Sequence, residues 1–307
     1  MPPAVYIPNF NGAAQLGRAL RGLREQTRPV DVVLADNGSG DDSVAVARRE
    51  LPDVKVLELG RNLGFGAAIN RAVAAHPAEE IILLNNDAEP EPRFVEALLE
   101  GLGAGVDSVA GVLTQERAPE LIDSAGVVAD ATLMGFDHLH GEPVEAAATA
   151  PDPLGPTGGA ALYRRSAFEA AGGFDERIFL YYEDLDLALR MAAAGRCRLA
   201  PEARALHAYS ASLGAASARK YGWTGWSRGY MLRRYGVMRS PRLALRALAC
   251  EGALCAGQLL RDRTAAGLRG RLRGWRDAAG LEPREVEAPL LDLSAREALA
   301  LRRRRRG

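Results

Sequence analysis

The sequence contains few of the features that mark secreted, membrane or metal-clustered proteins. Its three cysteines, Cys197, Cys250 and Cys255, are too few and too scattered for a disulfide framework or a zinc site, which fits a reducing cytoplasm. We find no uninterrupted apolar run of about 18 residues and no signal peptide. The sequence therefore predicts neither a membrane span nor export.

Two phosphate-binding signatures are also missing. No Gly-x-Gly-x-x-Gly follows the first predicted strand, where Asn9-Phe10-Asn11-Gly12 stands instead, and no Gly-Lys-Ser/Thr occurs anywhere. These absences argue against an ordinary dinucleotide dehydrogenase and against a P-loop NTPase.

The composition is that of a soluble globular protein, with 48% hydrophobic and 25% charged residues. A chain of 307 residues can bury a sizeable core, as one large domain or one domain plus a C-terminal appendage. The zero net charge hides a split: residues 1–203 carry 17 Lys/Arg against 31 Asp/Glu, and residues 204–307 carry 22 against 8. The basic C-terminal region predicts contact with an anionic surface, which could be a membrane, a nucleic acid or the acidic half itself.

In the N-terminal half, short apolar runs alternate with segments of helical periodicity. We expect strands over 4–7, 30–35, 54–59 and 81–84, and helices over 13–26, 43–50 and a segment ending near Ala75. This alternation predicts βαβ units and a parallel sheet. Further on we expect a helix over 94–102, strands over 109–113, 158–163 and 197–200, and an irregular segment over 114–156.

The run Ile81 to Leu84 is typical of a strand buried on both faces of a parallel sheet. Asn85-Asn86-Asp87 follows it, and Pro90 and Pro92 should stop the strand. Open α/β sheets bind ligands at the carboxyl ends of their strands. The Asp87 carboxylate could hold Mg²⁺ or Mn²⁺ against a diphosphate there; the alternative is that these residues only make a turn.

Polar residues also follow other predicted strands. Asp36 ends the second strand, where such folds hydrogen-bond a base or ribose, although an Asx turn or helix cap explains it equally well. Gly64, Gly66 and Asn70 would let backbone approach a ligand, or make a tight turn. His138-x-His140 has metal-like spacing, but without a nearby carboxylate or Cys it is more typical of a loop.

Glu183-Asp184-Leu185-Asp186 should open a helix over 184–194 that Gly195 ends. Acids in a first turn suit the helix dipole, which is sufficient to explain Glu183 and Asp186. The apolar positions place Asp184 at the edge of the buried face. His207 follows the next predicted strand.

Laid end to end, these stretches resemble the family 2 glycosyltransferases of GT-A fold, particularly the bacterial rhamnosyltransferase-like branch. Six signatures occur in the expected order: Ile7-Pro8-Asn9-Phe10-Asn11, Asp36-Asn37-Gly38-Ser39-x-Asp41-x-Ser43, Asn62-x-Gly64-Phe65-Gly66-x-x-x-Asn70, Leu84-Asn85-Asn86-Asp87, Gly172-Gly173-Phe174-Asp175-Glu176, and Phe179-x-Tyr181-x-Glu183-Asp184-x-Asp186-Leu187-x-x-Arg190. Pro201 and His207 follow in register. The resemblance covers roughly residues 4–238. It implies an α/β GT-A fold, a Rossmann-like and mainly parallel sheet flanked by helices. We expect a glycosyltransferase domain over 1–238 and a basic helical C-terminal region over 239–307.

The resemblance also implies roles for individual residues. The donor nucleotide-sugar would be bound by Pro8, Asn9, Asp36, Asn37, Asn62, Asn70, Asn86 and Asp87. Mg²⁺ or Mn²⁺ would be held by Asp87 and His207. Asp184 would be the general base, with Glu183 beside it, and the acceptor side would include Gly158, Gly159 and Tyr181.

The reaction implied is single displacement with inversion at the anomeric carbon. The donor would be dTDP-L-rhamnose or a UDP-hexose, and the acceptor a lipid-linked or polymeric glycan in polysaccharide or cell wall synthesis. Asn85 replaces the first acid of the family's metal motif, so the metal would depend mainly on Asp87 and His207. The alternatives are an inactive glycan-binding scaffold and a sugar nucleotidyltransferase, although the basic Gly-rich loop of the latter is absent.

The C-terminal region combines arginines with apolar helical periodicity. Trp223, Trp226 and Tyr230 lie on one predicted helix with several arginines. Further apolar positions at helical spacing follow among more arginines, at Leu243, Ala247, Leu248, Leu259 and Leu260. This composition predicts either an interfacial helix on anionic lipid or helices that pack on the acidic catalytic domain. We expect Arg302 to Arg306 to form a disordered tail. No nucleic-acid recognition fold is evident, so we expect a cytoplasmic protein, free or attached peripherally at the inner face of the cell membrane.

Overall fold

The centre of the N-terminal part is a mixed β-sheet. The computed structural model describes residues 3–193, 195–208 and 217–304. Within these residues the sheet has nine strands in the order β3-β2-β1-β4-β10-β6-β11-β5, with β7 paired to β6. The first four strands are β1 (Ala4–Asn9), β2 (Asp31–Asp36), β3 (Lys55–Glu58) and β4 (Glu80–Leu84). All four run parallel, as their alternation with helices predicts.

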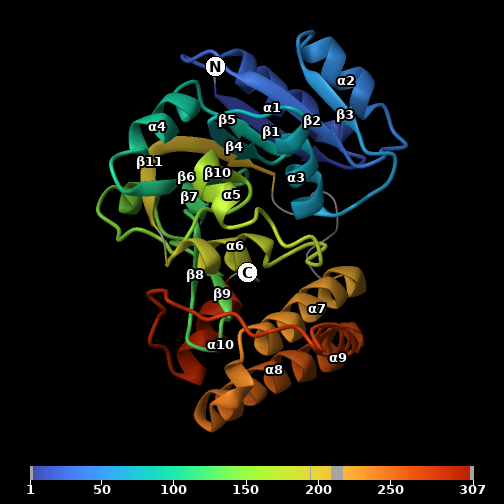
Figure 1. The fold of residues 1–307 in the computed structure, drawn as a ribbon, viewed down its shortest axis with the longest axis vertical. Helices are drawn as coiled ribbons and strands as arrows, with labels where there is room; N and C mark the ends of the chain where they lie inside the picture. Colours follow the sequence, from blue (N-terminus) through green and yellow to red (C-terminus); the bar gives the residue numbers. More distant parts are fainter. Residues whose placement is uncertain (1–2, 194, 209–216, 305–307) are drawn as a thin grey trace.

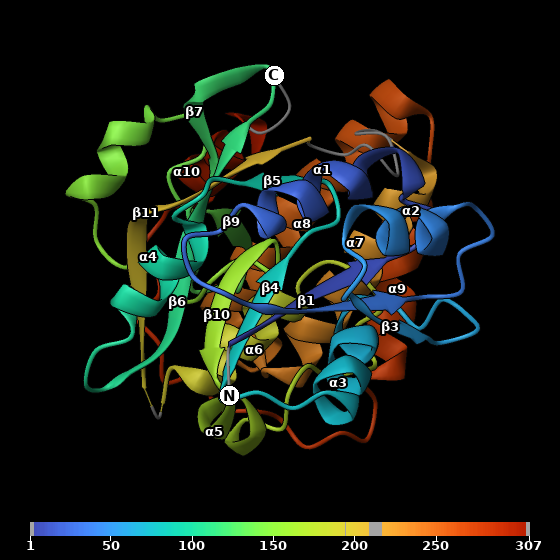
Figure 2. The same cartoon turned by 90° about the horizontal axis from the view of Figure 1, so that it is seen from above.

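Helices cover both faces of this sheet (Figures 1 and 2). One face packs against α1 (Ala13–Arg24), α2 (Ser43–Glu50) and α4 (Phe94–Gly101). The other packs against α3 (Phe65–Ala75), α5 (Arg165–Ala170) and α6 (Glu183–Met191). The layers are those of an α/β protein, and they leave the carboxyl ends of β1, β2 and β4 open on one edge.

The second half of the sheet differs from the sequence-based expectation in three places. β10 (Ala160–Arg164) lies antiparallel between β4 and β6 (Val106–Gln115). β11 (Arg196–His207) continues through Pro201, so the strand predicted over 197–200 is too short. The register of β11 against β6 shifts between Leu199 and Arg204. A proline can lie at such a bulge without the loss of a hydrogen bond between the strands. Pro90 ends the short strand β5 (Ala88–Pro90), which pairs with β11.

Residues 114–156 are more ordered than expected. They contain β7 (Ala118–Ser124), β8 (Val127–Ala129), β9 (Gly135–Asp137) and the 3₁₀ helix η1 (Val144–Ala148). The predicted helix over 184–194 is too long at its C-terminus, because α6 ends at Met191 with Ala192 as its C-cap. The position predicted to end it, Gly195, lies just before β11.

The C-terminal helices lie below the sheet in Figure 1, on the far side of α6. They are α7 (Ala218–Arg234), α8 (Pro241–Asp262), α9 (Ala266–Asp277) and α10 (Ala295–Arg304), with the 3₁₀ turn η2 (Val237–Arg239). One apolar cluster joins Leu185 and Leu189 of α6 to Tyr230 of α7 and Ala247 of α8. This packing crosses the predicted boundary at residue 238 and supports the packing alternative. That 1–238 and 239–307 are separate domains stays a prediction.

Ion pairs reinforce this contact. Arg284 donates to Asp186 at 2.5 Å and to Asp175 at 3.0 Å. Asp186 is fully buried and also accepts from the Tyr235 hydroxyl at 2.8 Å. Asp186 therefore fixes α6 against the C-terminal region and does not face a substrate.

One expectation about the C-terminal region is wrong. Arg302 lies in α10, so the predicted tail is helical up to Arg304; residues 305 and 306 lie outside the described residues. α8 has 22 residues and a mean hydropathy of 1.4 over its most apolar window, enough to cross a membrane by length and composition. The core helix of a soluble protein can have the same length and composition, so these two properties do not assign a span.

Candidate active site

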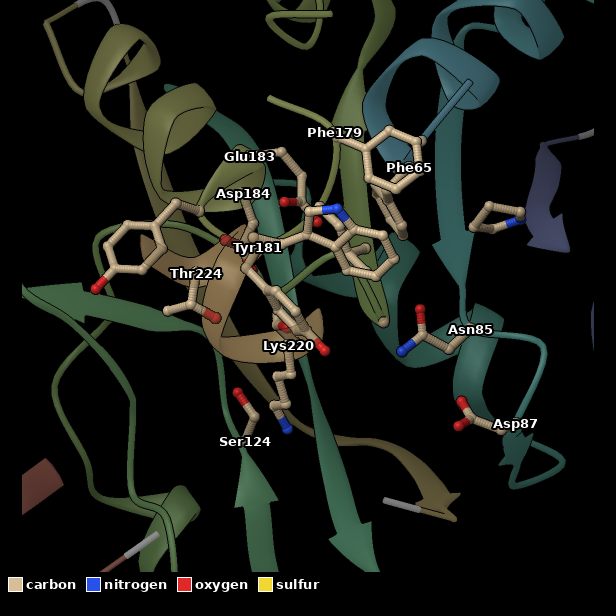
Figure 3. A pocket seen from close by; sticks show the side chains of 18 of the residues that line it. Phe65, Asn85, Asp87, Ser124, Phe179, Tyr181, Glu183, Asp184, Lys220 and Thr224 are labelled. Carbon is tan, nitrogen blue, oxygen red and sulfur yellow. The ribbon is translucent and has the colours of Figure 1, made fainter. Parts of the chain in front are cut away.

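A cavity of about 820 Å³ opens at the carboxyl ends of β1 and β4, between the sheet and helices α6 and α7. This volume is in the range of small-molecule sites. Most residues selected from the sequence line it: Pro8, Asn9, Asn37, Asn62, Asn86, Asp87, Gly158, Gly159, Tyr181, Glu183, Asp184 and His207. Figure 3 shows Asn85 and Asp87 on one side of the cavity and Glu183 and Asp184 on the other.

Asp36 and Asn70 do not line the cavity. Asp36 lies behind Asn9, whose side-chain amide donates to it at 3.1 Å, and it also accepts from the Ser39 backbone at 2.9 Å. Asn9 in turn accepts from Asn86 at 2.7 Å. This chain of bonds fixes Asn9 and Asn86 at the cavity wall, and Asp36 is its buried end.

Asn70 joins α3 to the turn at 172–176. Its side chain donates to the Phe174 carbonyl at 2.9 Å and accepts from the Phe174 amide at 3.0 Å. Both ends of the amide are thus used within the protein, and the geometry favours a structural role over a donor contact.

Glycines allow close approaches around the cavity. Gly64 has φ +90°, and a Cβ there would lie 2.3 Å from the Phe179 carbonyl oxygen. A Cβ at Gly158 would lie 2.6 Å from the Phe65 ring, and one at Gly159 would lie 2.8 Å from the Asn85 amide nitrogen. These positions bring the loop after β3, the end of β4 and the start of β10 together.

His207 lies between two carboxylates. Its Nδ1 is 2.7 Å from Asp123 and its Nε2 is 3.3 Å from Asp87, so the predicted convergence of Asp87 and His207 is present in the structure. Asp123 was not selected from the sequence. It lies on β7, which β6 brings next to β11, and no motif marks it in the segment expected to be irregular.

The charges around His207 determine its proton affinity. Burial alone would lower the pKa of His207, but the hydrogen bonds and charges of Asp123 and Asp87 outweigh it and raise the pKa to about 10. The Asn85 amide nitrogen lies 3.4 Å from Nε2. The site thus holds an imidazole between carboxylates, with an amide where the family motif has its first acid.

The donor set fits a divalent cation only in part. Among the described residues, no group of three or more His, Cys, Asp or Glu side chains is arranged to hold a metal. Asp87 and a deprotonated His207 would offer two ligand atoms on the cavity wall, and their side chains are only 11% and 12% exposed. Mg²⁺ is commonly held by one or two carboxylates plus substrate phosphates and water. A nucleoside diphosphate in the cavity would supply the missing oxygens.

Strained backbone precedes α6. Tyr181 and Tyr182 have φ of 69° and 74°, a left-handed conformation that bulky residues rarely adopt. Such outliers are concentrated at functional sites, where the surrounding structure maintains them. Here they turn the chain so that the first turn of α6 presents Glu183 and Asp184 to the cavity (Figure 3).

The two acids differ in surroundings. Glu183 is buried, and its Oε2 has no hydrogen-bond partner among the described residues. Burial and the neighbouring Asp184 charge raise the pKa of Glu183 to about 8, so this carboxyl keeps its proton at neutral pH. Asp184 is half-buried, and its Oδ1 accepts from the Leu185 amide at 2.8 Å. Asp184 is the acid on the open side of the pair.

α7 and α10 add lining residues that were not assigned to the site from the sequence. Arg219, Lys220, Trp223 and Thr224 come from α7, and Arg302 comes from α10. The Lys220 ammonium lies 5.6 Å from the centre of the Tyr181 ring, and the Phe179 and Trp223 rings are 4.9 Å apart. The sequence offered one hint that Lys220 belongs to the site: it is one of only two lysines in the sequence. The cavity therefore has an aromatic and basic wall on the α7 side.

Comparisons with known proteins agree with this geometry. The model of the family described as "Glycosyl transferase family 2" matches residues 4–172. The N-acetylglucosaminyl-diphospho-decaprenol L-rhamnosyltransferase of Mycobacterium tuberculosis is 34% identical over 244 residues, which cover 69% of this chain and 77% of that protein.

Solved structures share the fold at lower identity. The mannosyltransferase PcManGT of Pyrobaculum calidifontis has a TM-score of 0.53 at 20% identity, covering 91% of this chain and 86% of that one. TarS of S. aureus, residues 1–349, has a TM-score of 0.53 at 15% identity, covering 91% and 79%. With the sheet, the helices on both its faces and the cavity at its carboxyl edge, these matches lead to one conclusion: the chain belongs to glycosyl transferase family 2 and has the GT-A fold, as its motifs predict.

Proposed function

We propose that the protein transfers rhamnose or a hexose from a nucleotide-diphosphate sugar to a hydroxyl of a lipid-linked glycan, with inversion at the anomeric carbon. One observation carries the proposal: the cavity has Asp87 and His207 on its sheet side and Asp184 on its α6 side. A transfer site needs both, a place for the leaving diphosphate and a base for the incoming hydroxyl. The name of the mycobacterial relative supports a rhamnosyl donor and a lipid-linked acceptor.

On the donor side, Pro8, Asn9 and Asn37 would contact the nucleoside, with Asn62 and Asn86 beside it. Asp87 and His207 would hold Mg²⁺ or Mn²⁺, and the similar mannosyltransferase PcManGT was solved in complex with GDP-Man and Mn²⁺. When bound, such an ion supplies Lewis-acid neutralisation of the charge that develops on the departing diphosphate.

On the acceptor side, Asp184 would take the proton of the acceptor hydroxyl. A positioned base typically contributes about 10²–10⁴-fold to such a step. Glu183 keeps its own proton at neutral pH, so it would donate a hydrogen bond to a sugar oxygen rather than compete as the base. Gly158, Gly159 and Tyr181 would shape the acceptor side of the cavity.

The decisive experiment compares wild type with Asp184→Asn in sugar transfer from dTDP-L-rhamnose and from UDP-hexoses to a polyprenyl-diphosphate-linked N-acetylglucosamine. We expect kcat to fall at least about 10²-fold while donor affinity stays nearly constant. Asp292→Asn, at an exposed position, is the matched control. Near-normal turnover in folded Asp184→Asn would show that the base lies elsewhere, and no turnover of any donor by wild type would remove the proposal.

Metal dependence is tested separately. EDTA should abolish transfer, and Mn²⁺ or Mg²⁺ should restore it, because Asp87 and His207 alone cannot neutralise a leaving diphosphate. Full activity in chelator would remove the metal from the proposal and leave the transferase assignment intact.

An acceptor anchored in a bilayer also requires an enzyme that works at the membrane surface. We therefore place the protein in the cytoplasm, at the inner face of the cell membrane.

A further inference from the structure

The outward face of α8 is apolar. Leu245, Leu248, Leu259 and Leu260 are 57% to 80% exposed. The other exposed positions between Arg242 and Arg261 are alanine or glycine, at 249, 252, 253 and 256. Scattered surface leucines are ordinary, but a continuous apolar face over about four turns of one helix marks an interaction surface.

The inward face of the same helix mixes the apolar Ala247 and Cys250 with two buried polar residues. Glu251 and Gln258 are both 6% exposed and point into the protein. Glu251 is bound by Arg228 of α7 at 2.7 Å and by Arg271 of α9 at 2.5 Å. A surface helix of a globular protein normally buries most of its large apolar side chains. Of the leucines of α8, only Leu243 and Leu254 pack against apolar clusters of this chain, and the four outward leucines do not.

Arginines surround the apolar face. Arg242 precedes it, and Arg261 and Arg263 follow it. On α9, Leu268 and Leu272 are 47% and 60% exposed and alternate with the exposed Arg269 and Arg273. Figure 1 shows α8 at the edge of the molecule farthest from the sheet. A helix with leucines on its outer face and arginines at its margins is the arrangement that binds in the headgroup region of a bilayer.

We propose that the outer faces of α8 and α9 form a membrane-docking surface that lies in the interface of an anionic phospholipid bilayer. Lipid fits better than a second copy of the chain, because residues 204–307 carry 22 Lys/Arg against 8 Asp/Glu and two such surfaces would repel each other. Anionic headgroups complement the arginines.

The helix lies on the bilayer rather than across it. A span would pull Glu251 away from Arg228 and Arg271 and place its carboxylate in hydrocarbon, which is costly. The proposal rests on the proposed function only for the lipid-linked acceptor that gives the docking a purpose.

The surface includes Leu248, Leu259 and Leu260, which belong to the interfacial helix that the sequence suggested, but not the aromatic residues expected with them. Of the aromatic residues that suggested an interfacial helix, Tyr230 is fully buried, and Trp226 stacks on it with ring centres 5.1 Å apart. These side chains pack against the catalytic part, and the exposed leucines of α8 take the outward position.

The test uses the full chain and no donor or acceptor, so its result is independent of catalysis. Vesicles of phosphatidylcholine, with or without phosphatidylglycerol, are sedimented with the protein at low and high salt. Wild type should bind the anionic vesicles strongly at low salt and less at high salt, since salt screens the arginines. Leu248→Ser with Leu260→Ser should weaken binding at least about tenfold, because both side chains lose their apolar burial.

Arg261→Gln should weaken binding to the anionic vesicles by about fivefold and leave binding to pure phosphatidylcholine unchanged. The matched control is Arg24→Gln, an exposed arginine at the end of α1 that should have no effect. Equal melting temperatures show that the variants are folded.

Three results would overturn the proposal: no binding of wild type to anionic vesicles at low salt, unchanged binding of the leucine variant, or a dimer that the leucine variant dissociates without any change in lipid binding. Intact vesicle binding without any sugar transfer would count against the proposed function alone.

Discussion

Helices α1 and α8 both have leucines at helical spacing, but α1 buries its leucine face and α8 exposes most of its own. In α1, Leu16, Leu20 and Leu23 face the sheet and are buried, and the arginines face outward. In α8, four leucines face outward, and Glu251 faces inward beside the partly buried Leu243 and Leu254. Periodicity shows which residues share a face, but it does not show what covers that face. The covering element is a property of the tertiary structure.

The C-terminal helices and the cavity also differ in the charges around their buried glutamates, Glu251 and Glu183. Burial alone would raise the pKa of Glu251, but the charges of Arg228 and Arg271 outweigh it and lower that pKa. Glu183 is equally buried, has Asp184 as its neighbour and has its pKa raised to about 8. The C-terminal helices thus neutralise their buried acid, whereas the cavity leaves its acid uncompensated, as functional sites often do.

The largest effect on stability is expected from removing Glu251. Glu251→Ala leaves Arg228, which is 2% exposed, without its counter-charge. Breaking a buried pair in this way costs about 3–5 kcal/mol of unfolding free energy. Urea unfolding measures it, with the exposed Glu285→Ala as a control within about 0.5 kcal/mol. A small loss would show that the arginines find other partners.

Leu20→Ala in α1 should cost about 2–5 kcal/mol, because the side chain is fully buried and its removal leaves a cavity against the sheet. The same urea titration measures it. A loss well below about 2 kcal/mol, the floor of this range, would mean that the site collapses around the smaller residue.

Glu183→Gln should change the pH dependence of stability. Because the folded pKa is raised, the wild type loses stability as the pH rises from the ordinary value of 4.5 to about 8, and the loss then levels off. Because one proton per molecule is involved, the unfolding free energy changes by at most about 1.4 kcal/mol per pH unit. The glutamine variant should lack this slope, so its melting temperature should rise relative to wild type from pH 5 to pH 8, roughly the window between the two pKa values. Parallel curves for the two proteins would contradict the raised pKa.

Asp123→Ala should weaken Mn²⁺ binding about 10–100-fold, the usual effect of losing the carboxylate that orients a histidine ligand. Isothermal titration with Mn²⁺ and a nucleoside diphosphate measures it without turnover. Asp123→Asn, which can still accept from His207 Nδ1, should retain part of the affinity, and Ser124→Ala serves as the neighbouring control. Equal affinities throughout would remove Asp123 from the metal site.

The smallest change in unfolding free energy is expected from an exposed leucine of α8, the counterpart of the buried Leu20 of α1. Leu260→Ala should change the unfolding free energy by no more than about 0.5 kcal/mol, because this leucine is 80% exposed. A loss close to that of Leu20→Ala would mean that α8 packs against a part of the chain outside the described residues.

The sequence by itself determined the parallel strands, the family and most of the cavity residues. Strands β1, β2 and β4 end in Asn9, Asp36 and Leu84, and parallel strands bring their carboxyl ends to one edge whatever the rest of the chain does. The six motifs in order include Asp87 and Asp184, and His207 follows them in register; all three line the cavity.

The tertiary structure decided the rest, because it depends on contacts between distant segments. Asp123 meets His207 across 84 positions of sequence, through strand pairings that no local pattern predicts. Arg302 reaches the cavity from the last described helix, although a run of arginines alone predicts a solvated tail. The outward leucines of α8 follow from the same cause: Arg228 and Arg271 draw Glu251 inward, and the opposite face of the helix must then face outward.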